Sequence, residues 1–271
     1  MLPARRSAVD GLDGAAGLEG GPFSSTQCDA LCQGTQGWQS CTPIEDGGVS
    51  LIRCQPFLCL GRRPEGLASS SAAPGTLLGA YFAEMARLEG ASVHAFRHLR
   101  RELVEHRAPR RLVRAAERAA RDEIRHARMT AALAWRHGGL AVAPTVQPRP
   151  VRDLEAIALE NAVEGCAREA FGALIATWQA VAARDPEIRA VMARIARDET
   201  RHAVLAFEVD AWLRKRLDPS VRARVAQARR DAFAELADGS TDVPTALRVP
   251  LGLPSRLQSR AFAEAMEHLA A

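Results

Sequence analysis

The sequence predicts an all-α fold: a four-helix bundle built from two duplicated antiparallel hairpins joined by a long crossover, with extra helices at the C-terminal end. Three observations support this fold class. Among the 271 residues the apolar ones are mostly Ala, Leu and Val, and only 5% are aromatic, a composition that favours helices. The helical pattern runs with few breaks from about residue 76 to 216, and two of its segments recur.

Glycine and proline residues divide this region into four long helices. They are expected over residues 77–106, 109–137, 151–183 and 185–216. Gly138 and Gly139 end the second helix, and Asp185 followed by Pro186 begins the fourth. Three prolines between residues 144 and 150 exclude a helix from the intervening segment.

The lengths of the connections predict how these helices are arranged. The first two helices are joined by a tight turn, as are the last two, so each pair is expected to form an antiparallel hairpin. The segment 138–150 can reach about 43 Å when it is extended at about 3.3 Å per residue. The second helix is about 42 Å long at about 1.5 Å per residue. The segment can therefore cross back along the whole bundle.

Composition divides the chain into three parts. Residues 1–75 form a segment of low regularity, rich in Gly, Ser, Pro and Gln, that contains five of the six cysteines. Residues 76–216 form the predicted four-helix bundle. Residues 217–271 form a helical C-terminal extension, in which one helix is expected over about 219–237 and a short one at the end.

Charge and hydropathy limit the classes of partner. The net charge is +4, and charges of both signs alternate along the helices, which is typical of a solvated helix surface and not of a nucleic-acid-binding face. No segment approaches the ~20 apolar residues of a membrane span. We therefore expect neither a nucleic-acid partner nor a membrane-spanning helix.

The N-terminal cysteines bear on the compartment. They are Cys28, Cys32, Cys41, Cys54 and Cys59. No Cys-x-x-Cys pair occurs, which disfavours a structural zinc site, and their density favours disulfides in an oxidising compartment such as the periplasm or cell envelope. The N-terminus lacks an apolar signal-peptide region, which favours the cytoplasm. The sequence leaves this conflict open.

The two predicted hairpins share sequence motifs in register. Residues 89–99 read EGASVHAFRHL, and residues 164–174 read EGCAREAFGAL. Residues 120–127 read ARDEIRHA, and residues 196–203 read ARDETRHA. The second copies follow the first by 75 and 76 residues. Such nearly equal offsets indicate that one helical hairpin was duplicated.

The repeated residues are suited to binding metal. In each copy of the octet a glutamate and a histidine lie three residues apart, so both project from one face of a helix. Four glutamates inside a bundle are very costly unless cations neutralise them, and two divalent metal ions would do so. Oxygen-rich ligation with one imidazole per metal favours iron or manganese. The predicted ligands are Glu89, Glu123, His126, Glu164, Glu199 and His202.

On these residues the chain resembles the ferritin-like superfamily of di-iron carboxylate proteins, over about residues 77–216. In that superfamily one glutamate from each of two helices, and Glu-x-x-His from each of the other two, hold the metals. The longer motif Asp-Glu-x-Arg-His, at residues 122–126 and 198–202, is more similar to bacterial di-iron monooxygenases than to storage ferritins.

The resemblance implies two iron ions, with manganese or a mixed iron–manganese pair as alternatives, and dioxygen activated to oxidise or hydroxylate an unknown substrate. It also suggests an electron donor and a small homo-oligomer. Two other functions stay open. One is a ferritin-like protein that oxidises and sequesters iron, which the long terminal segments disfavour because they would burden a closed cage. The other is a structural bundle that kept the fold without metal.

Residues next to the ligands are expected to support them. In the monooxygenases that the chain resembles, the aspartate before a ligand glutamate orients a histidine of the other half. Asp122 is therefore predicted to orient His202, and Asp198 is predicted to orient His126. The alternative is that both aspartates pair with surface arginines. Glu160, one turn before the third-helix glutamate, is a candidate as an extra ligand, as an acid in a substrate pocket or as the partner of an arginine.

Glycines and phenylalanines near the ligands also repeat. Gly90 and Gly165 follow the ligand glutamates inside helices, where glycine costs about 1 kcal/mol relative to alanine. Either they permit a close helix approach or a π-bulge beside the metals, or the duplication copied a harmless glycine. Phe96 and Phe171 are expected to cap the site with apolar surface or to pack in the core.

Overall fold

The computed structural model describes residues 39–46, 49–56, 62–68, 75–238, 243 and 245–270. The chain divides into two compact units, Met1–Phe57 and Leu58–Ala271. In the first unit the backbone forms a two-stranded antiparallel sheet of β1 (Gln39–Asp46) and β2 (Val49–Pro56). The segment predicted to have low regularity thus contains a hairpin.

The predicted disulfides involve cysteine side chains that lie outside what the structure describes. Cys28, Cys32 and Cys59 lie outside the described residues, and so do the side chains of Cys41 and Cys54. The backbone register sets Cys41 opposite Cys54 across the two strands. Pairing of the N-terminal thiols stays a prediction.

The second unit consists of helices joined by short and long connecting segments. Its helices are α2 (Leu77–Glu105), α3 (Arg110–Arg136), α4 (Leu154–Glu160), the π-helix η2 (Asn161–Glu169), α5 (Ala170–Ala182), α6 (Pro186–Arg214), α7 (Pro219–Asp238), α8 (Thr245–Leu251) and α9 (Arg256–Ala270). The four helices predicted from the sequence correspond within a few residues to α2, α3, the continuous segment α4–η2–α5, and α6. The helix expected over about residues 219–237 corresponds to α7.

Side chains at the helix starts fix these boundaries. Thr76 precedes α2, and its hydroxyl accepts a hydrogen bond from a first-turn N–H at 3.0 Å. Asp153 caps α4 by accepting from a backbone N–H at 2.8 Å. Asp185 caps α6 in the same way, and Pro186 occupies the first turn. Such caps satisfy donors that the helix itself leaves unpaired.

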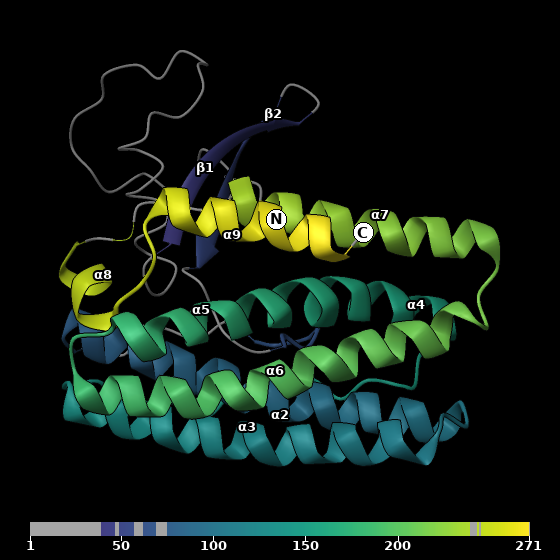
Figure 1. Cartoon of the computed structure of the whole chain (residues 1–271), viewed down its shortest axis with the longest axis horizontal. Coiled ribbons are helices and arrows are strands. Elements are labelled where there is room, and N and C mark those ends of the chain that lie inside the picture. The colour runs from purple at the N-terminus through teal and green to yellow at the C-terminus, as the bar shows by residue number, and fades with distance from the viewer. Residues whose placement is uncertain are drawn as a thin grey trace. The chain divides into compact units, whose positions relative to one another are not determined.

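The long helices of the second unit lie side by side (Figure 1). α2 packs along α3 and α5 packs along α6, while α6 also contacts α3 and η2. The segment between α3 and α4 returns along the bundle and forms a β-bridge between Val146 and Leu67. α7 packs on α4, η2 and α9. The prediction that this part of the chain is helical is confirmed for the described residues of this unit, and its long helices pack in pairs as a bundle requires.

The bundle interior is built from aliphatic and small side chains. One core cluster includes Phe96, Leu99, Leu112, Ala116 and Leu205, of which none is more than 3% exposed. Burying each leucine contributes about 1.5–3 kcal/mol, and the alanines let helix backbones approach closely. This packing holds the inward-facing polar side chains of the same helices in fixed positions.

Candidate metal centre

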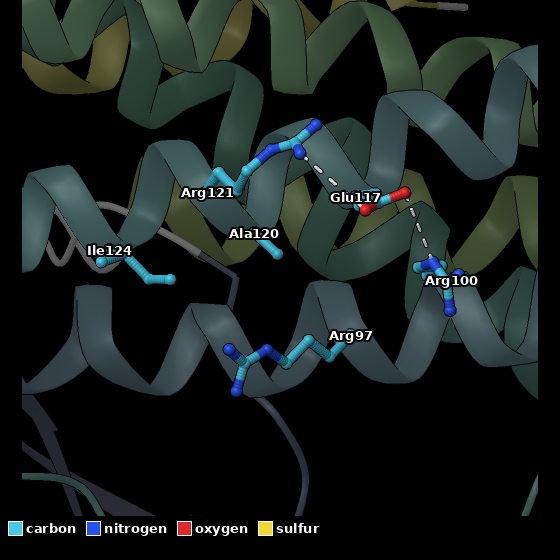
Figure 2. Close-up of a pocket in the computed structure, with 6 residues that line it drawn as sticks. All are labelled: Arg97, Arg100, Glu117, Ala120, Arg121 and Ile124. Carbon is cyan, nitrogen blue, oxygen red and sulfur yellow. Dashed lines mark ion pairs between the residues drawn. The ribbon is translucent and has the colours of Figure 1, made fainter.

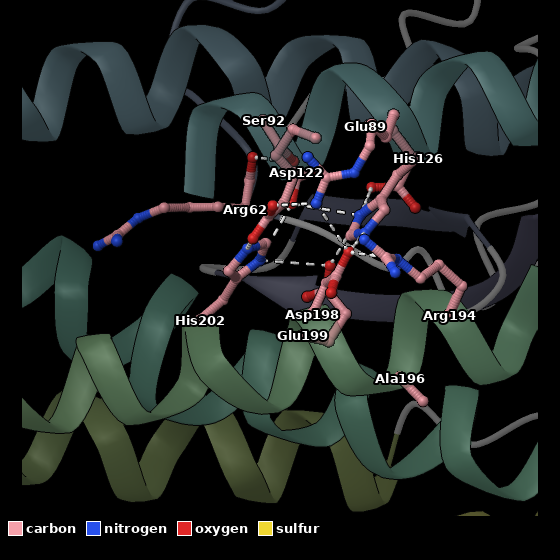
Figure 3. A network of polar contacts seen from close by, with 12 residues as sticks. Arg62, Glu89, Ser92, Asp122, His126, Arg194, Ala196, Asp198, Glu199 and His202 are labelled. Carbon is pink, nitrogen blue, oxygen red and sulfur yellow. Dashed lines mark hydrogen bonds and ion pairs between the residues drawn. The ribbon is translucent and has the colours of Figure 1, made fainter. Parts of the chain in front are cut away.

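Charged side chains from three helices meet inside the apolar bundle. They are Glu89 of α2, Glu123 and His126 of α3, and Glu199 and His202 of α6. None is more than 2% exposed. Figure 3 shows Asp122, His126, Asp198 and His202 facing one another between α3 and α6. The side chains that the sequence assigned to metal binding on these three helices therefore lie together.

Two overlapping groups of donor atoms could each hold a metal ion. In the described residues, Glu89, Glu123, His126 and Glu199 form one group, and Glu169, Glu199 and His202 form the other. The donor atoms within each group lie within 4.8 Å of one another. Glu199 belongs to both groups, so one carboxylate lies between the two positions.

Glu123 and Glu199 lie at the centre of the cluster, since each is close to both histidines. His126 Nδ1 lies 3.5 Å from Glu123 Oε1 and 3.3 Å from Glu199 Oε1. His202 Nδ1 lies 3.1 Å from Glu123 Oε1 and 3.4 Å from Glu199 Oε1. Glu89 approaches the first histidine only, with its Oε2 3.7 Å from His126 Nδ1. Two carboxylates thus contact both imidazoles.

The donor atoms of this cluster lack hydrogen-bond partners. Both carboxylate oxygens of Glu89, Glu123, Glu169 and Glu199 are buried without one, and so is Nδ1 of each histidine. The contacts between the imidazoles and the carboxylates are close but not aligned as hydrogen bonds. Unpaired buried polar atoms are costly and uncommon in native proteins. A bound cation would satisfy them all, so the residues present fit a metal site.

The electrostatics of the cluster also favour bound cations. Burial, and then repulsion from Glu123, raise the pKa of Glu89 well above its usual value. Burial also raises the pKa of Glu169 well above its usual value. Burial opposes charge on His126 and His202, but the surrounding carboxylates raise the pKa of both imidazoles. Protons on the imidazoles would be displaced by metal ions, which need the Nδ1 lone pairs.

The crossed contacts between the two halves are present. His126 Nε2 lies 3.2 Å from Asp198 Oδ2, and His202 Nε2 lies 3.4 Å from Asp122 Oδ2. Each aspartate therefore reaches a histidine of the other hairpin, as predicted. A proton held at Nε2 leaves Nδ1 free to bind metal and fixes the ring orientation.

Both aspartates also contact arginines. The predicted contact with a histidine and the alternative contact with an arginine therefore occur together. Arg201 Nη2 donates to Asp122 Oδ2 at 3.1 Å, and Arg125 Nη2 donates to Asp198 Oδ2 at 3.2 Å. The arginines are partly exposed, whereas the aspartates are buried. Burial opposes ionisation of Asp122, but hydrogen bonds from His202 and Arg125 lower its pKa below the usual range. The aspartates therefore stay ionised beside the histidines.

Glu164 lies outside both donor groups. Its Oε2 accepts a hydrogen bond from the backbone N–H of Arg63 at 3.1 Å, and its Oε1 pairs with the guanidinium of Arg168. The glutamate that joins Glu199 and His202 is Glu169, five residues further along the same segment. The structure therefore brings five of the six predicted ligands together and sets Glu169 where the sequence register expects Glu164.

The π-helix explains this exchange of glutamates. In η2 the backbone hydrogen bonds close wider turns than in an α-helix, so side chains that follow are rotated away from an α-helical register. The sequence alignment with α2 matches Glu169 to His94, which is exposed. The alignment of the two hairpins therefore did not identify Glu169. The one signal in the sequence was the possible π-bulge at Gly165, which would change the helical register after it.

Close packing surrounds both repeated glycines. A Cβ at Gly165 would lie 2.7 Å from Ala206 Cβ of α6, so η2 presses against that helix. A Cβ at Gly90 would lie 3.0 Å from Pro144 Cδ of the crossover segment, in a regular α-helix. A close helix approach and a π-helix are thus both found at Gly165, whereas Gly90 lies in a regular α-helix and is approached by the crossover segment, not by another helix.

Glu160 pairs with an arginine and lies outside the donor groups. Its Oε1 accepts from Arg62 Nε at 2.8 Å, and its Oε2 accepts from Arg62 Nη2 at 2.9 Å. The sequence prediction allowed for an arginine partner, but Arg62 belongs to the segment before the bundle and carried no signal. Its side chain is 1% exposed. A cation from outside the four helices therefore lies inside the bundle.

One aromatic side chain, that of Phe96, packs against the donor cluster. The ring of Phe96 lies 4.9 Å from the ring of His202, centroid to centroid, and Arg62 lies over the same phenylalanine at 5.8 Å. Phe96 also belongs to the apolar core. Phe171 is buried as well. Both predicted roles of Phe96 therefore coexist.

A separate pocket opens on the surface between α2 and α3 (Figure 2). Its volume is about 270 Å³, and its lining residues are Arg97, Arg100, Glu117, Ala120, Arg121 and Ile124. It shares no residue with the donor groups. Three arginines and one glutamate line it together with the apolar side chains of Ala120 and Ile124.

Two further findings concern the chain as a whole. No helix among the described residues combines the length and apolar character needed to cross a membrane. Comparison of the chain with protein-family models, with curated proteins and with solved structures finds no match. Any functional interpretation therefore rests on the geometry and chemistry of the buried centre.

Proposed function

We propose that this chain is a ferritin-like, non-haem di-iron protein that activates dioxygen to oxidise or hydroxylate a substrate. The observation that carries the proposal is the set of buried donor atoms without hydrogen-bond partners, on four glutamates and two histidines. Such a set has a high free-energy cost unless cations occupy it. Two divalent ions would balance four carboxylates in charge.

The arrangement of helices supports the ferritin-like assignment. α2 with α3, and α5 with α6, pack as two pairs, and the segment between the pairs is long enough to cross the bundle. One long crossover between two hairpins is the connectivity of ferritin-like folds, in which the metal lies between inward-facing glutamates and Glu-x-x-His motifs. The donor groups come from α2, α3, η2 and α6, which supports this assignment.

The proposed ligand set differs from the sequence prediction at one residue. Glu169 replaces Glu164, so the number of carboxylates stays at four. The nitrogen and oxygen donors favour iron or manganese over metals that prefer thiolates. The proposed ligands are Glu89, Glu123, His126, Glu169, Glu199 and His202.

Iron bound here would supply the redox chemistry that dioxygen activation requires. The protein residues supply position and protection. Asp198 and Asp122 hold the Nε2 atoms of the two histidines, so that both Nδ1 atoms face the carboxylates. Glu123 and Glu199 approach both imidazoles, and Glu199 would contribute to both metal positions. Phe96 and the surrounding core keep bulk water away from the donors.

Rapid mixing tests the choice of dioxygen chemistry. Anaerobically prepared di-ferrous protein, mixed with dioxygen in a stopped-flow instrument, is expected to give a transient visible absorbance, and sizing is expected to show a small oligomer. A Glu123→Ala variant treated in the same way should give no transient. A hollow cage that accumulates iron far beyond two ions per chain would instead favour iron sequestration, and failure to take up any metal would favour a structural bundle.

A further inference from the structure

Two buried polar side chains of the π-helix η2 belong to neither donor group. Asn161 is the first residue of η2, and Cys166 follows it five residues later. Both residues are 0% exposed. Buried amides in native proteins are hydrogen-bonded, so the partners of Asn161 show what its side chain holds together.

The amide of Asn161 joins the start of η2 to two other parts of the chain. Its Nδ2 donates to the backbone carbonyl of Ala206 in α6 at 2.9 Å. Its Oδ1 accepts from Nη2 of Arg62 at 3.0 Å. Arg62 is itself held to α2, because Ser92 Oγ donates to its carbonyl oxygen at 2.9 Å. With a donor on one end and an acceptor on the other, the amide is fixed in one orientation.

A third contact of this amide depends on the type of helix. Nδ2 of Asn161 also donates to Sγ of Cys166 at 3.7 Å. In an α-helix, side chains five residues apart point about 140° away from each other and do not meet. In a π-helix the backbone hydrogen bonds join residues five apart, so such side chains come together. Sulfur is a weak acceptor, but this contact exists only in the π-helical register.

The packing of η2 on α6 involves the same amide. A Cβ at Gly165 would lie 2.7 Å from Cβ of Ala206 and 3.0 Å from Oδ1 of Asn161. The amide therefore lies against the backbone of Gly165 while it reaches over to α6. Asn161 and Gly165 together keep this turn of η2 close to α6.

The other hairpin shows which residues accompany the π-helix. At the repeat offset of 75 residues, Ala86 and Ala91 of α2 correspond to Asn161 and Cys166. The glycine is present in both copies, yet α2 is a regular α-helix. The shared glycine therefore does not specify a π-helix by itself. The asparagine and cysteine are present only in the copy that has one.

The register of η2 decides where its last residue points. That residue is Glu169, the member of the donor groups that η2 contributes. We propose that Asn161, through its contacts with Ala206 and Cys166, sets the π-helical register and is thereby the positioning residue for Glu169. The inference rests on the proposed function, because it concerns the metal position that Glu169 shares with Glu199 and His202.

Metal affinity tests this role with a readout other than activity. Cobalt(II) is titrated into metal-free protein, and the visible absorbance gives the affinity for each ion. Asn161→Leu keeps a side chain of the same length but loses all three contacts, while Arg62 keeps its bonds to Glu160. The variant is expected to bind one of the two ions roughly 10–100-fold more weakly, as when a ligand loses the group that orients it.

A double-mutant cycle with Glu169→Gln separates positioning from stability. In the wild-type background Glu169→Gln should weaken one ion by at least the same roughly 10–100-fold. In the Asn161→Leu background Glu169 no longer faces the metal, so the same change should add no more than about twofold, the usual scatter of additive effects. Glu89→Gln is the matched control, because Glu89 belongs to the regular helix α2. Its effect should be the same in both backgrounds.

Three results would overturn the inference and leave the di-metal site intact. The first is an unchanged affinity for both ions in Asn161→Leu. The second is that the losses from Asn161→Leu and Glu169→Gln multiply, as independent effects do, because Asn161 would then serve stability alone. The third is that the effect of Glu89→Gln also disappears in the Asn161→Leu background, because the whole centre would then be disturbed.

Cys166→Ala carries the test should Asn161→Leu fail to fold. It places in η2 the residue that α2 has at position 91, and it removes the contact between residues five apart while the bond to Ala206 stays. A smaller loss of affinity for the same ion is expected, and unchanged affinity for both ions would refute the role. Wild-type protein that binds no cobalt, iron or manganese would instead overturn the proposed function together with the role of Asn161.

Discussion

The two halves of the bundle agree on one side of the candidate metal centre and differ on the other. α3 and α6 carry matching octets, and their contacts match as well. His126 Nε2 lies 3.2 Å from Asp198, and His202 Nε2 lies 3.4 Å from Asp122. The partner helices differ, because α2 is a regular α-helix and the segment from α4 to α5 contains a π-helix.

The difference shows what a sequence repeat can and cannot locate. Glu89 faces the centre from α2, whereas its counterpart Glu164 pairs with Arg168, and Glu169 takes the inner position. A repeat identifies equivalent positions only where both copies have the same number of residues per turn. The π-helix changes that number in one copy, so equivalence in sequence no longer means equivalence in space.

The largest expected effect comes from a residue that both donor groups share. Glu199 belongs to both donor groups, so Glu199→Ala should reduce metal uptake from about two ions per chain to below one. Elemental analysis after reconstitution with ferrous iron measures this. Glu208→Gln is the control, because Glu208 lies on the same helix but is exposed and pairs with Arg111. Full occupancy in the Glu199→Ala protein would refute the shared position.

A second pair of variants tests the exchange of glutamates directly. Glu169→Gln should weaken metal binding at the group of Glu169, Glu199 and His202 by at least the roughly 10–100-fold typical of a lost supporting group, because a proposed ligand itself is removed. Glu164→Gln should leave both binding steps near their wild-type affinities, since Glu164 faces Arg168 and the backbone of Arg63. A larger loss of affinity in Glu164→Gln than in Glu169→Gln would instead support Glu164 as the ligand, as the sequence alignment predicts.

Much of the bundle could be predicted from the sequence because its signals are local. Proline and glycine mark the helix ends, and the spacing of Glu123 and His126 fixes a shared face whatever the helices around them do. Glu169 and Arg62 could not be predicted in the same way. The position of Glu169 depends on a local change of helix type, and that of Arg62 on a contact between distant segments.

Variants of Asp122 and Asp198 test the side of the candidate centre on which the two halves match. Asp122→Asn and Asp198→Asn each remove a charged acceptor from one histidine, and each should lower metal affinity roughly 10–100-fold. The two losses should be similar, because the two contacts are nearly symmetric. Competition with a chromophoric chelator measures the affinities. A large loss in one variant and none in the other would show that only one aspartate orients its histidine.

The smallest expected effect concerns the glycines. Gly165→Ala places a Cβ 2.7 Å from Ala206 on a packed helix, which should cost about 1–3 kcal/mol of unfolding free energy. Gly90→Ala places its Cβ 3.0 Å from Pro144, and the gain in helix propensity of about 1 kcal/mol should offset most of the crowding. Chemical denaturation of the metal-free proteins compares the two. Equal costs would argue against tighter packing at the π-helix.

The central claim is that the buried glutamates and histidines hold two metal ions. An anaerobic titration of chelator-free wild-type protein with ferrous iron, followed by elemental analysis of the desalted product, measures this most directly. About two irons per chain are expected, as in other sites with this ligand set. Protein that retains no iron, and no manganese when manganese is supplied instead, would contradict the account.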